Sequence, residues 1–323
     1  MKIIRKLQVL LLMIPVLGAS QGHAEPLRVS YSSISPVNAG LWVAQEVGAF
    51  KRHSLDVKFI YISSSGTNVQ ALLGGSLDVA TAGASGIFTA AARGAPIVAV
   101  GAIMNRTPAT LYVQPEITKI EELKGKALAI SGYGSAGHAI TVLLLRKFGL
   151  EKDVFLMPVG GVPQRLAAFE RKAVAGVMTA VKPNVPARAL LNAGDLDIPL
   201  PYSIMAITHN YLRDHPDLIL RFLRGYIEGV ALMLREKETS IKILAKYLNR
   251  MDRAFLEETY NFAVTYTDRV PTVDPRAVST VLEFSDIKGI IAETLVTKVI
   301  DNSLVDKLVE EKFIEKLFGK GVR

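Results

Sequence analysis

The sequence predicts an α/β protein built from two doubly wound lobes joined by a two-segment hinge. Short β-rich runs alternate with stretches of helical period, which is typical of strand–helix units around a largely parallel sheet. The alternation starts afresh near residue 127, and roughly 300 residues follow the first 24, a length at which single cores give way to two. From Tyr211 onward the pattern is helical, and these helices need a lobe to cover.

The chain opens on a basic segment followed by an apolar run from Leu7 to Ala19, with small residues at Gly22 and Ala24. This order is typical of a secretory signal peptide, so we expect residues 1–24 to be cleaved after Ala24. A membrane-spanning helix is the alternative, but it needs about 20 apolar residues and this run has about 13. The sequence holds no cysteine. A periplasmic protein without a lipid anchor or disulfide is therefore expected.

The formal charge of +8 includes three positive charges of the predicted signal peptide. The other Lys and Arg residues are spread among the acids, without a block of five or six like charges. We therefore expect no nucleic-acid partner. The histidines beyond residue 24 are scattered without the spacing of metal ligands, and we expect no cofactor and no metal.

The first lobe begins at residue 25 with three strand–helix units and a fourth strand. The strands are expected over 27–33, 55–63, 77–83 and 96–104, and the helices over 38–53, 65–75 and 85–93. Glycines at the helix ends, such as Gly74 and Gly94, support these boundaries.

The second lobe follows an extended run over 110–114. Its strands are expected over 127–131, 154–159 and 175–179, and its helices over 136–148 and 163–172. An extended run over 198–208 contains Pro199 and Pro201, which suits an edge or crossing strand, and we interpret it as the return to the first lobe. The division is therefore 25–113 and 205–323 for the first lobe and 114–204 for the second.

Five segments resemble proteins of the SsuA/THI5-like (NMT1-like) family. They are LWVAQEVGAF at 41–50, LDV at 55–57, ALLGGSLDVA at 71–80, AARGAPIV at 91–98 and ELKGK at 122–126. The resemblance covers residues 27 to about 210. It implies the type II periplasmic binding protein fold and a receptor that delivers an alkanesulfonate, taurine, nitrate or a pyrimidine precursor to the permease subunits of an ABC importer. It also implies that the lobes close around the ligand. From the two-lobed chain we expect a monomer that binds one small ligand.

Ligands of open α/β sheets bind at the carboxyl ends of the strands, where this chain places four loops rich in small polar residues. Each loop precedes a helix, so unpaired N–H groups and hydroxyls favour a polar or anionic ligand, although an ordinary helix cap explains any one loop alone. No arginine stands in these loops. The predicted ligand-binding residues are Ser33, Ser35, Ser64, Ser65, Gly66, Ala84, Ser85, Ser131, Gly132, Tyr133, Gly134 and Ser135. Trp42, Thr179 and Ser203 are further candidates, with core packing as the alternative for Trp42.

Two enzyme classes compete with a receptor. Gly132 to Gly137 fits the dinucleotide pattern GxGxxG, but Gly160 and Gly161 stand after the next strand where an acid should hold the ribose. A THI5-like or related-fold enzyme acting on a pyrimidine precursor is the second alternative. The Cys- and His-bearing pattern of the THI5-like enzymes is absent here, since the chain has no cysteine.

Overall fold

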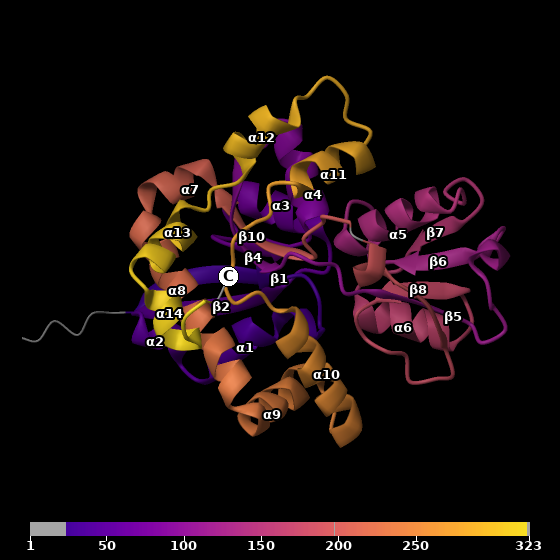
Figure 1. The fold of residues 1–323 in the computed structure, drawn as a ribbon, viewed down its shortest axis with the longest axis horizontal. Helices are drawn as coiled ribbons and strands as arrows, with labels where there is room; N and C mark the ends of the chain where they lie inside the picture. The colour runs from indigo at the N-terminus through magenta and orange to yellow at the C-terminus, as the bar shows by residue number, and fades with distance from the viewer. Residues whose placement is uncertain (1–23, 197, 322–323) are drawn as a thin grey trace, which may run out of the picture.

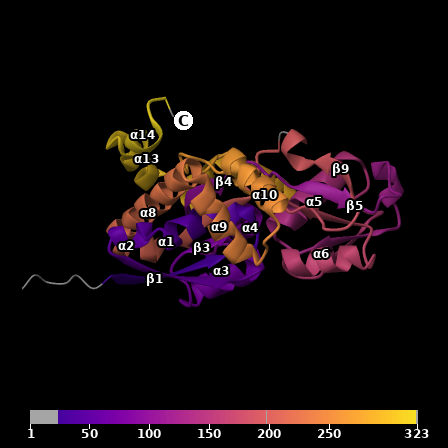
Figure 2. The same cartoon turned by 90° about the horizontal axis from the view of Figure 1, so that it is seen from below.

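The computed structural model describes residues 24–196 and 198–321, which form two α/β lobes lying side by side (Figures 1 and 2). The predicted signal peptide lies outside the described residues, apart from its last residue, Ala24. Within the described ranges, every helix is too short or too polar to cross a bilayer.

The N-terminal part of the first lobe alternates strands with helices, as predicted. Its elements are β1 (Glu25–Tyr31), the 3-10 turn η1 (Pro36–Asn38), α1 (Ala39–Glu46), α2 (Ala49–Arg52), β2 (Leu55–Tyr61), α3 (Ser65–Leu73), β3 (Ala80–Ala82), α4 (Ala84–Ala92) and β4 (Ile97–Met104). The single helix expected over 38–53 is two helices, because Gly48 adopts a left-handed conformation, with φ of +71°, that ends α1.

The second lobe is a separate sheet with its own helices. It contains β5 (Thr110–Val113), η2 (Ile120–Leu123), β6 (Ala127–Ile130), α5 (Ala136–Lys147), β7 (Phe155–Pro158), α6 (Val162–Glu170), β8 (Gly176–Thr179), β9 (Arg188–Asn192) and η3 (Ala193–Leu196). The strand order is β7-β6-β8-β5-β9, with β6 parallel to β7 and β8 and with β5 antiparallel to its neighbours.

Two extended segments connect the lobes, and the boundary expected at residue 113 is corrected. The run at 110–113 is β5 of the second sheet, so the first connection is residues 105–109. The return strand is β10 (Ser203–Thr208), which lies between β3 and β4 in the first lobe and runs antiparallel to both. The two connections are bonded to each other, since the Thr107 hydroxyl donates to the Leu200 carbonyl at 2.6 Å.

Helices from the C-terminal third cover the first lobe. They are α7 (His209–Asp214), α8 (Pro216–Arg235), α9 (Lys237–Leu248), α10 (Arg253–Tyr266), α11 (Ala277–Phe284), α12 (Ala292–Val299), α13 (Ser303–Glu310) and α14 (Phe313–Phe318). Helix α8 packs along α1 so closely that Gly229 touches the backbone of Ala44 and leaves no room for a Cβ. Figure 1 shows these yellow and orange helices on the same lobe as the indigo N-terminal strands.

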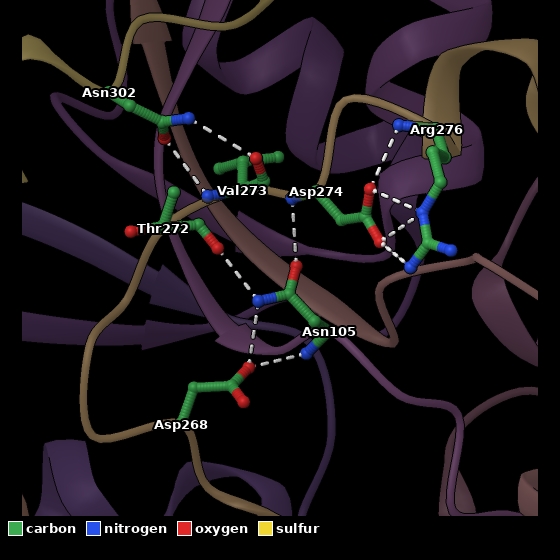
Figure 3. A network of polar contacts seen from close by, with 7 residues as sticks. All are labelled: Asn105, Asp268, Thr272, Val273, Asp274, Arg276 and Asn302. Carbon is green, nitrogen blue, oxygen red and sulfur yellow. Dashed lines mark hydrogen bonds and ion pairs between the residues drawn. The ribbon is translucent and has the colours of Figure 1, made fainter. Parts of the chain in front are cut away.

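The start of the first connection is fixed by the segment after α10. The Asn105 backbone N–H donates to the Asp268 carboxylate at 2.6 Å, and its side-chain amide donates to the same oxygen at 3.0 Å and to the Thr272 carbonyl at 2.7 Å. The Asp274 N–H donates back to Asn105 at 3.0 Å (Figure 3). One side chain at the lobe boundary therefore binds three points of the C-terminal segment.

Candidate ligand-binding cleft

A small cavity lies between the lobes, at the carboxyl ends of their strands. Its volume is about 30 Å³, which is room for about two water molecules. The lining residues are Ser32, Ser33, Val37, Ser63, Ser65 and Gly83 of the first lobe, Ser131, Ser135, Ala136, Gly137, Gly161 and Arg165 of the second, and Tyr202 and Ser203 of the return connection. All four predicted loops contribute to this lining.

Four helices direct their N-termini at the cavity. Ser65 begins α3, Gly83 precedes α4, Ser135 caps α5 by accepting from the His138 N–H at 3.2 Å, and Gly161 precedes α6. Unpaired N–H groups and the positive ends of the helix dipoles favour negative charge at such a point. The field inside the cavity is therefore suited to an anion.

Two glycines let the lobes touch. A Cβ at Gly83 would come within 2.6 Å of the Ala136 Cβ and 2.8 Å of its backbone nitrogen, across the boundary. On the second lobe, a Cβ at Gly161 would overlap the Tyr61 hydroxyl of the first. Both glycines adopt ordinary extended backbone, so what they supply is space. In the described structure the two lobes are therefore in contact at both glycines.

Arg165, in the first turns of α6, carries the only full charge in the cavity lining. It is 4% exposed, and its Nη1 donates to the Met178 carbonyl at 2.7 Å while its Nε has no hydrogen-bond partner. Burial lowers the pKa of Arg165, and the nearby hydroxyls of Tyr202 and Tyr61 oppose that shift. Among the described residues, no carboxylate forms an ion pair with it.

Two further buried hydroxyls lie near Arg165. Among the described residues, Ser203 Oγ in the cavity wall has no hydrogen-bond partner, and Tyr61 Oη lies at the contact with Gly161, where the Ser63 side chain interacts with it. Burial raises the pKa of Tyr61 and the charge of Arg165 works against that rise, so the hydroxyl is a neutral donor. Buried polar groups are normally paired. Arg165 and Ser203 line the same cavity, and both can donate to a small oxyanion there.

The predicted residues of the four loops either line this cavity, lie next to its lining, or line a neighbouring cavity. Ser33, Ser65, Ser131, Ser135 and Ser203 line it. Ser35 shares a hydrogen bond of 2.7 Å with Ser33, and a Cβ at Gly132 would lie 3.7 Å from Ser64 Oγ. Ser85 donates across the lobe boundary to the Gly134 carbonyl at 3.0 Å. Gly66, Tyr133 and Gly134 line a neighbouring cavity instead.

Three more predicted residues, besides Ser35, Ser64, Ser85 and Gly132, line neither cavity. Trp42 is fully buried and stacks on Tyr247, with ring centroids 4.8 Å apart. The α9 helix that carries Tyr247 covers this face, so Trp42 is corrected from a ligand-binding candidate to a core residue. Thr179 accepts a hydrogen bond from the Val181 N–H at the end of β8, and Ala84 is buried within the first lobe.

Arg165 was missed because we searched the loops for charge. It stands four residues after Gly161, on the first turn inside the predicted helix. The signal that could have found it is a basic residue in the first turn of a helix that directly follows a strand. Side chains in that turn lie close to the carboxyl edge of the sheet, where ligands bind.

Two α/β lobes that meet over a small polar cavity are the architecture of the periplasmic binding protein fold. The chain belongs to the NMT1/THI5-like family, whose model matches residues 35–240. The resemblance seen in the sequence, and with it the type II periplasmic binding protein fold, is confirmed.

Known proteins agree with this assignment. A Brucella abortus (strain 2308) protein whose name calls it a binding protein is 26% identical over 241 residues, 72% of this chain and 74% of its own. The alkanesulfonate-binding protein SsuA from Xanthomonas axonopodis pv. citri, bound to MOPS, is similar with a TM-score of 0.69 and 20% identity, over 87% of this chain and 96% of its own. The nitrate-binding protein NrtA from Synechocystis PCC 6803 has a TM-score of 0.69 and 14% identity, over 89% of each chain. These structures share the fold.

Proposed function

We propose that this protein is the periplasmic solute receptor of an ABC importer, and that it captures a small anion between its lobes by closing around it. A closed lobe pair then signals a loaded receptor to the permease subunits. The receptor acts as a monomer, because one chain supplies both walls of the cavity.

The observation that carries the proposal is the unpaired charge of Arg165. Burying a guanidinium without a counter-ion costs several kcal/mol. An anion in the cavity would offset that cost and would also accept a hydrogen bond from Ser203. The converging helix N-termini contribute in the same direction.

The structural relatives support the same class of ligand. Their names assign them alkanesulfonate and nitrate, both of which are oxyanions. The small volume at Arg165 suits a compact head group such as nitrate, a sulfonate or a carboxylate.

Isothermal titration calorimetry of the mature protein with nitrate, methanesulfonate and acetate tests the proposal, with acetamide and methylammonium as neutral and cationic analogues. At least one anion should bind and raise the melting temperature by mass action, whereas the analogues should not. Arg165→Gln should weaken that anion at least about 100-fold, the loss of roughly 3 kcal/mol expected for a buried charged partner.

Arg171→Gln is the matched control, because Arg171 lies exposed at the other end of α6. It should bind like the wild type. If the analogues bind as well as the anions, or if Arg165→Gln binds like Arg171→Gln, the anion receptor is refuted.

A further inference from the structure

A second, larger cavity lies across the lobe boundary, and the proposed anion site does not use it. Its volume is about 610 Å³, and it lies between α3 and α4 of the first lobe, α5 of the second and the end of α11. The hydrogen bond from Ser85 Oγ to the Gly134 carbonyl, at 3.0 Å, and the close contact of Gly86 with Ser65 separate it from the cavity at Arg165. An occupant of the larger cavity in this state is therefore a separate molecule from the anion.

The inner wall of this second cavity is aromatic and apolar. The Tyr133 and His138 rings meet edge to face at 5.2 Å, and the His138 and Phe284 rings do the same at 5.2 Å. Val69 and Val142 complete the wall. Burial lowers the pKa of His138, so its ring is neutral near pH 7. Such a wall suits a planar apolar ring.

The charges around the second cavity balance. Two arginines, Arg93 and Arg146, and two acids, Glu151 and Asp286, belong to its lining. Arg146 pairs with Glu151 at 2.7 Å and with Asp286 at 3.2 Å. A charged molecule entering the cavity would lose hydration without a net attraction to offset the loss. The lining therefore favours an uncharged occupant.

The second cavity opens to solvent while the lobes are in contact. Gln70 and Arg93 of its lining are exposed, and Tyr133 is 64% exposed. The small cavity differs, since Arg165 and Ser203 in its wall are buried. A molecule can therefore enter or leave the second cavity while the anion stays enclosed.

The two lobes share the lining of the second cavity. Val69 and Phe284 belong to the first lobe, and Tyr133 and His138 belong to the second. A molecule that fills the cavity contacts both lobes only while they are together, so it binds that arrangement more tightly than the separated one. It therefore shifts the population toward the closed form.

We infer that the second cavity is a regulatory site for an uncharged planar aromatic molecule, and that its occupation tightens the anion at Arg165. The coupling rests on the proposed function, since it takes the anion to close the same two lobes, whereas the site itself does not. Coupling between two sites is reciprocal, so the anion must tighten the aromatic molecule by the same factor.

The fluorescent probe N-phenyl-1-naphthylamine tests the inference on the mature protein. It is uncharged and too large for the cavity of about 30 Å³ at Arg165. One probe should bind per chain. A saturating concentration of the small anion found by calorimetry should raise the probe's affinity at least about fivefold, and saturating probe should raise the anion's affinity equally. The same compound with a sulfonate, 8-anilinonaphthalene-1-sulfonate, should bind less tightly because its charge loses hydration.

Three variants locate the probe. Ala90→Phe should abolish probe binding and the probe's effect on the anion, because Ala90 lines the second cavity from α4. Ala92→Phe is the matched control, since it adds the same ring to the same helix but lines a different hollow beside Ile290. Arg165→Gln should bind the probe alone as the wild type does. Thermal melts verify that all three are folded.

The outcomes separate the site, its coupling and the proposed function. The second site is refuted if Ala90→Phe and Ala92→Phe bind the probe alike, if Arg165→Gln loses the probe, or if probe and anion compete. Tighter binding of the sulfonate would refute the uncharged class of ligand. If probe and anion bind without affecting each other, the coupling is refuted. If no small anion binds the wild type, the proposed function and the coupling fail together, and Ala90→Phe still decides the site.

Discussion

Gly83 of the first lobe and Ala136 of the second meet at a distance that excludes any side chain at position 83: a Cβ there would lie 2.6 Å from the Ala136 Cβ. Gly83→Ala should therefore oppose closure. The backbone of Gly83, at φ −62° and ψ 134°, accepts alanine, so each lobe should fold as before. Strain of about 1–3 kcal/mol in the closed form would weaken anion binding about 5- to 100-fold.

Small-angle X-ray scattering checks this prediction, since the variant should keep a larger radius of gyration at an anion concentration that compacts the wild type. Gly66→Ala is the control because its new Cβ would lie 3.7 Å from Ser64 Oγ, an ordinary contact. Wild-type affinity in Gly83→Ala would show that the lobes do not approach as described.

Arg146 at the end of α5 connects the second lobe to the C-terminal part of the first. It donates to the Glu283 carbonyl at 3.0 Å and pairs with Asp286 at 3.2 Å, and within its own lobe it pairs with Glu151 at 2.7 Å. Arg146→Gln should lower anion affinity by about two- to fivefold, the effect of a largely exposed ion pair. Glu151→Gln, which removes only the pairing within the lobe, should leave affinity unchanged. Equal affinities in a calorimetric titration of both variants would contradict a latch role.

Asp268 and Asp274 bind the same Asn105 network and should titrate with opposite effects on stability (Figure 3). Burial raises the pKa of Asp268 to about 6, against the hydrogen bonds from Asn105. The folded state therefore holds a proton more tightly than the unfolded one, and this group's contribution to stability is present at pH 4 and lost as the pH rises through about 6. The hydrogen bond from Arg276 holds the pKa of Asp274 below its usual value, so its contribution is present at neutral pH and lost in acid.

Urea unfolding between pH 2 and 7 measures both effects. Asp268→Asn should remove a loss of roughly 3 kcal/mol that accompanies rising pH in the wild type, whereas Asp274→Asn should flatten the profile at the acid end. An unchanged pH profile in Asp268→Asn would show that this carboxyl titrates as it does in water.

Variants of Trp42 and Tyr61 should have different effects: one should change the free energy of unfolding and the other the anion affinity. Trp42→Phe removes ring area from the fully buried stack on Tyr247, and it should lower the free energy of unfolding by about 2 kcal/mol with unchanged anion affinity. Tyr61→Phe removes a buried hydroxyl at the contact between the lobes, so affinity should fall about 2- to 10-fold with little change in stability. Chemical denaturation measures the free energy of unfolding of both variants, and calorimetry measures their anion affinity. Weakened anion binding by Trp42→Phe would show that Trp42 contributes to the binding site.

The sequence predicted the serine-rich loops around the candidate site, but it did not predict the charged residue in that site, Arg165. Strand ends and helix starts are local signals, and because parallel strands share one carboxyl edge, serines as distant as Ser33, Ser65 and Ser135 could be placed together. Arg165 could not be found this way, because it stands inside a helix and its orientation depends on how α6 packs on the sheet. The prediction that Trp42 binds ligand was wrong for a related reason: its stacking partner, Tyr247, lies 205 positions away in the sequence.

The predicted lobe boundary at residue 113 was wrong because the sequence of a strand does not show which sheet the strand joins. Residues 110–113 have strand character in either sheet, and only the pairing of Thr110 with Thr179 and Asn192 assigns them to the second. Strand β9 was not predicted, since Arg188–Asn192 follows a proline-interrupted loop and lacks alternation. Partners of strands are decided by the whole sheet, beyond the reach of a short window.

The position of β10 also sets the order in which the lobes can be completed as the chain is made. All five strands of the second sheet lie between residues 110 and 192, so that sheet can close once this stretch is available. In the first lobe, whose strands begin at residue 25, the three-stranded sheet has a gap between β3 and β4 until Ser203–Thr208 is available to fill it. The lobe that starts first is therefore finished last, and until then it exposes two unpaired strand edges to any chaperone or neighbouring chain.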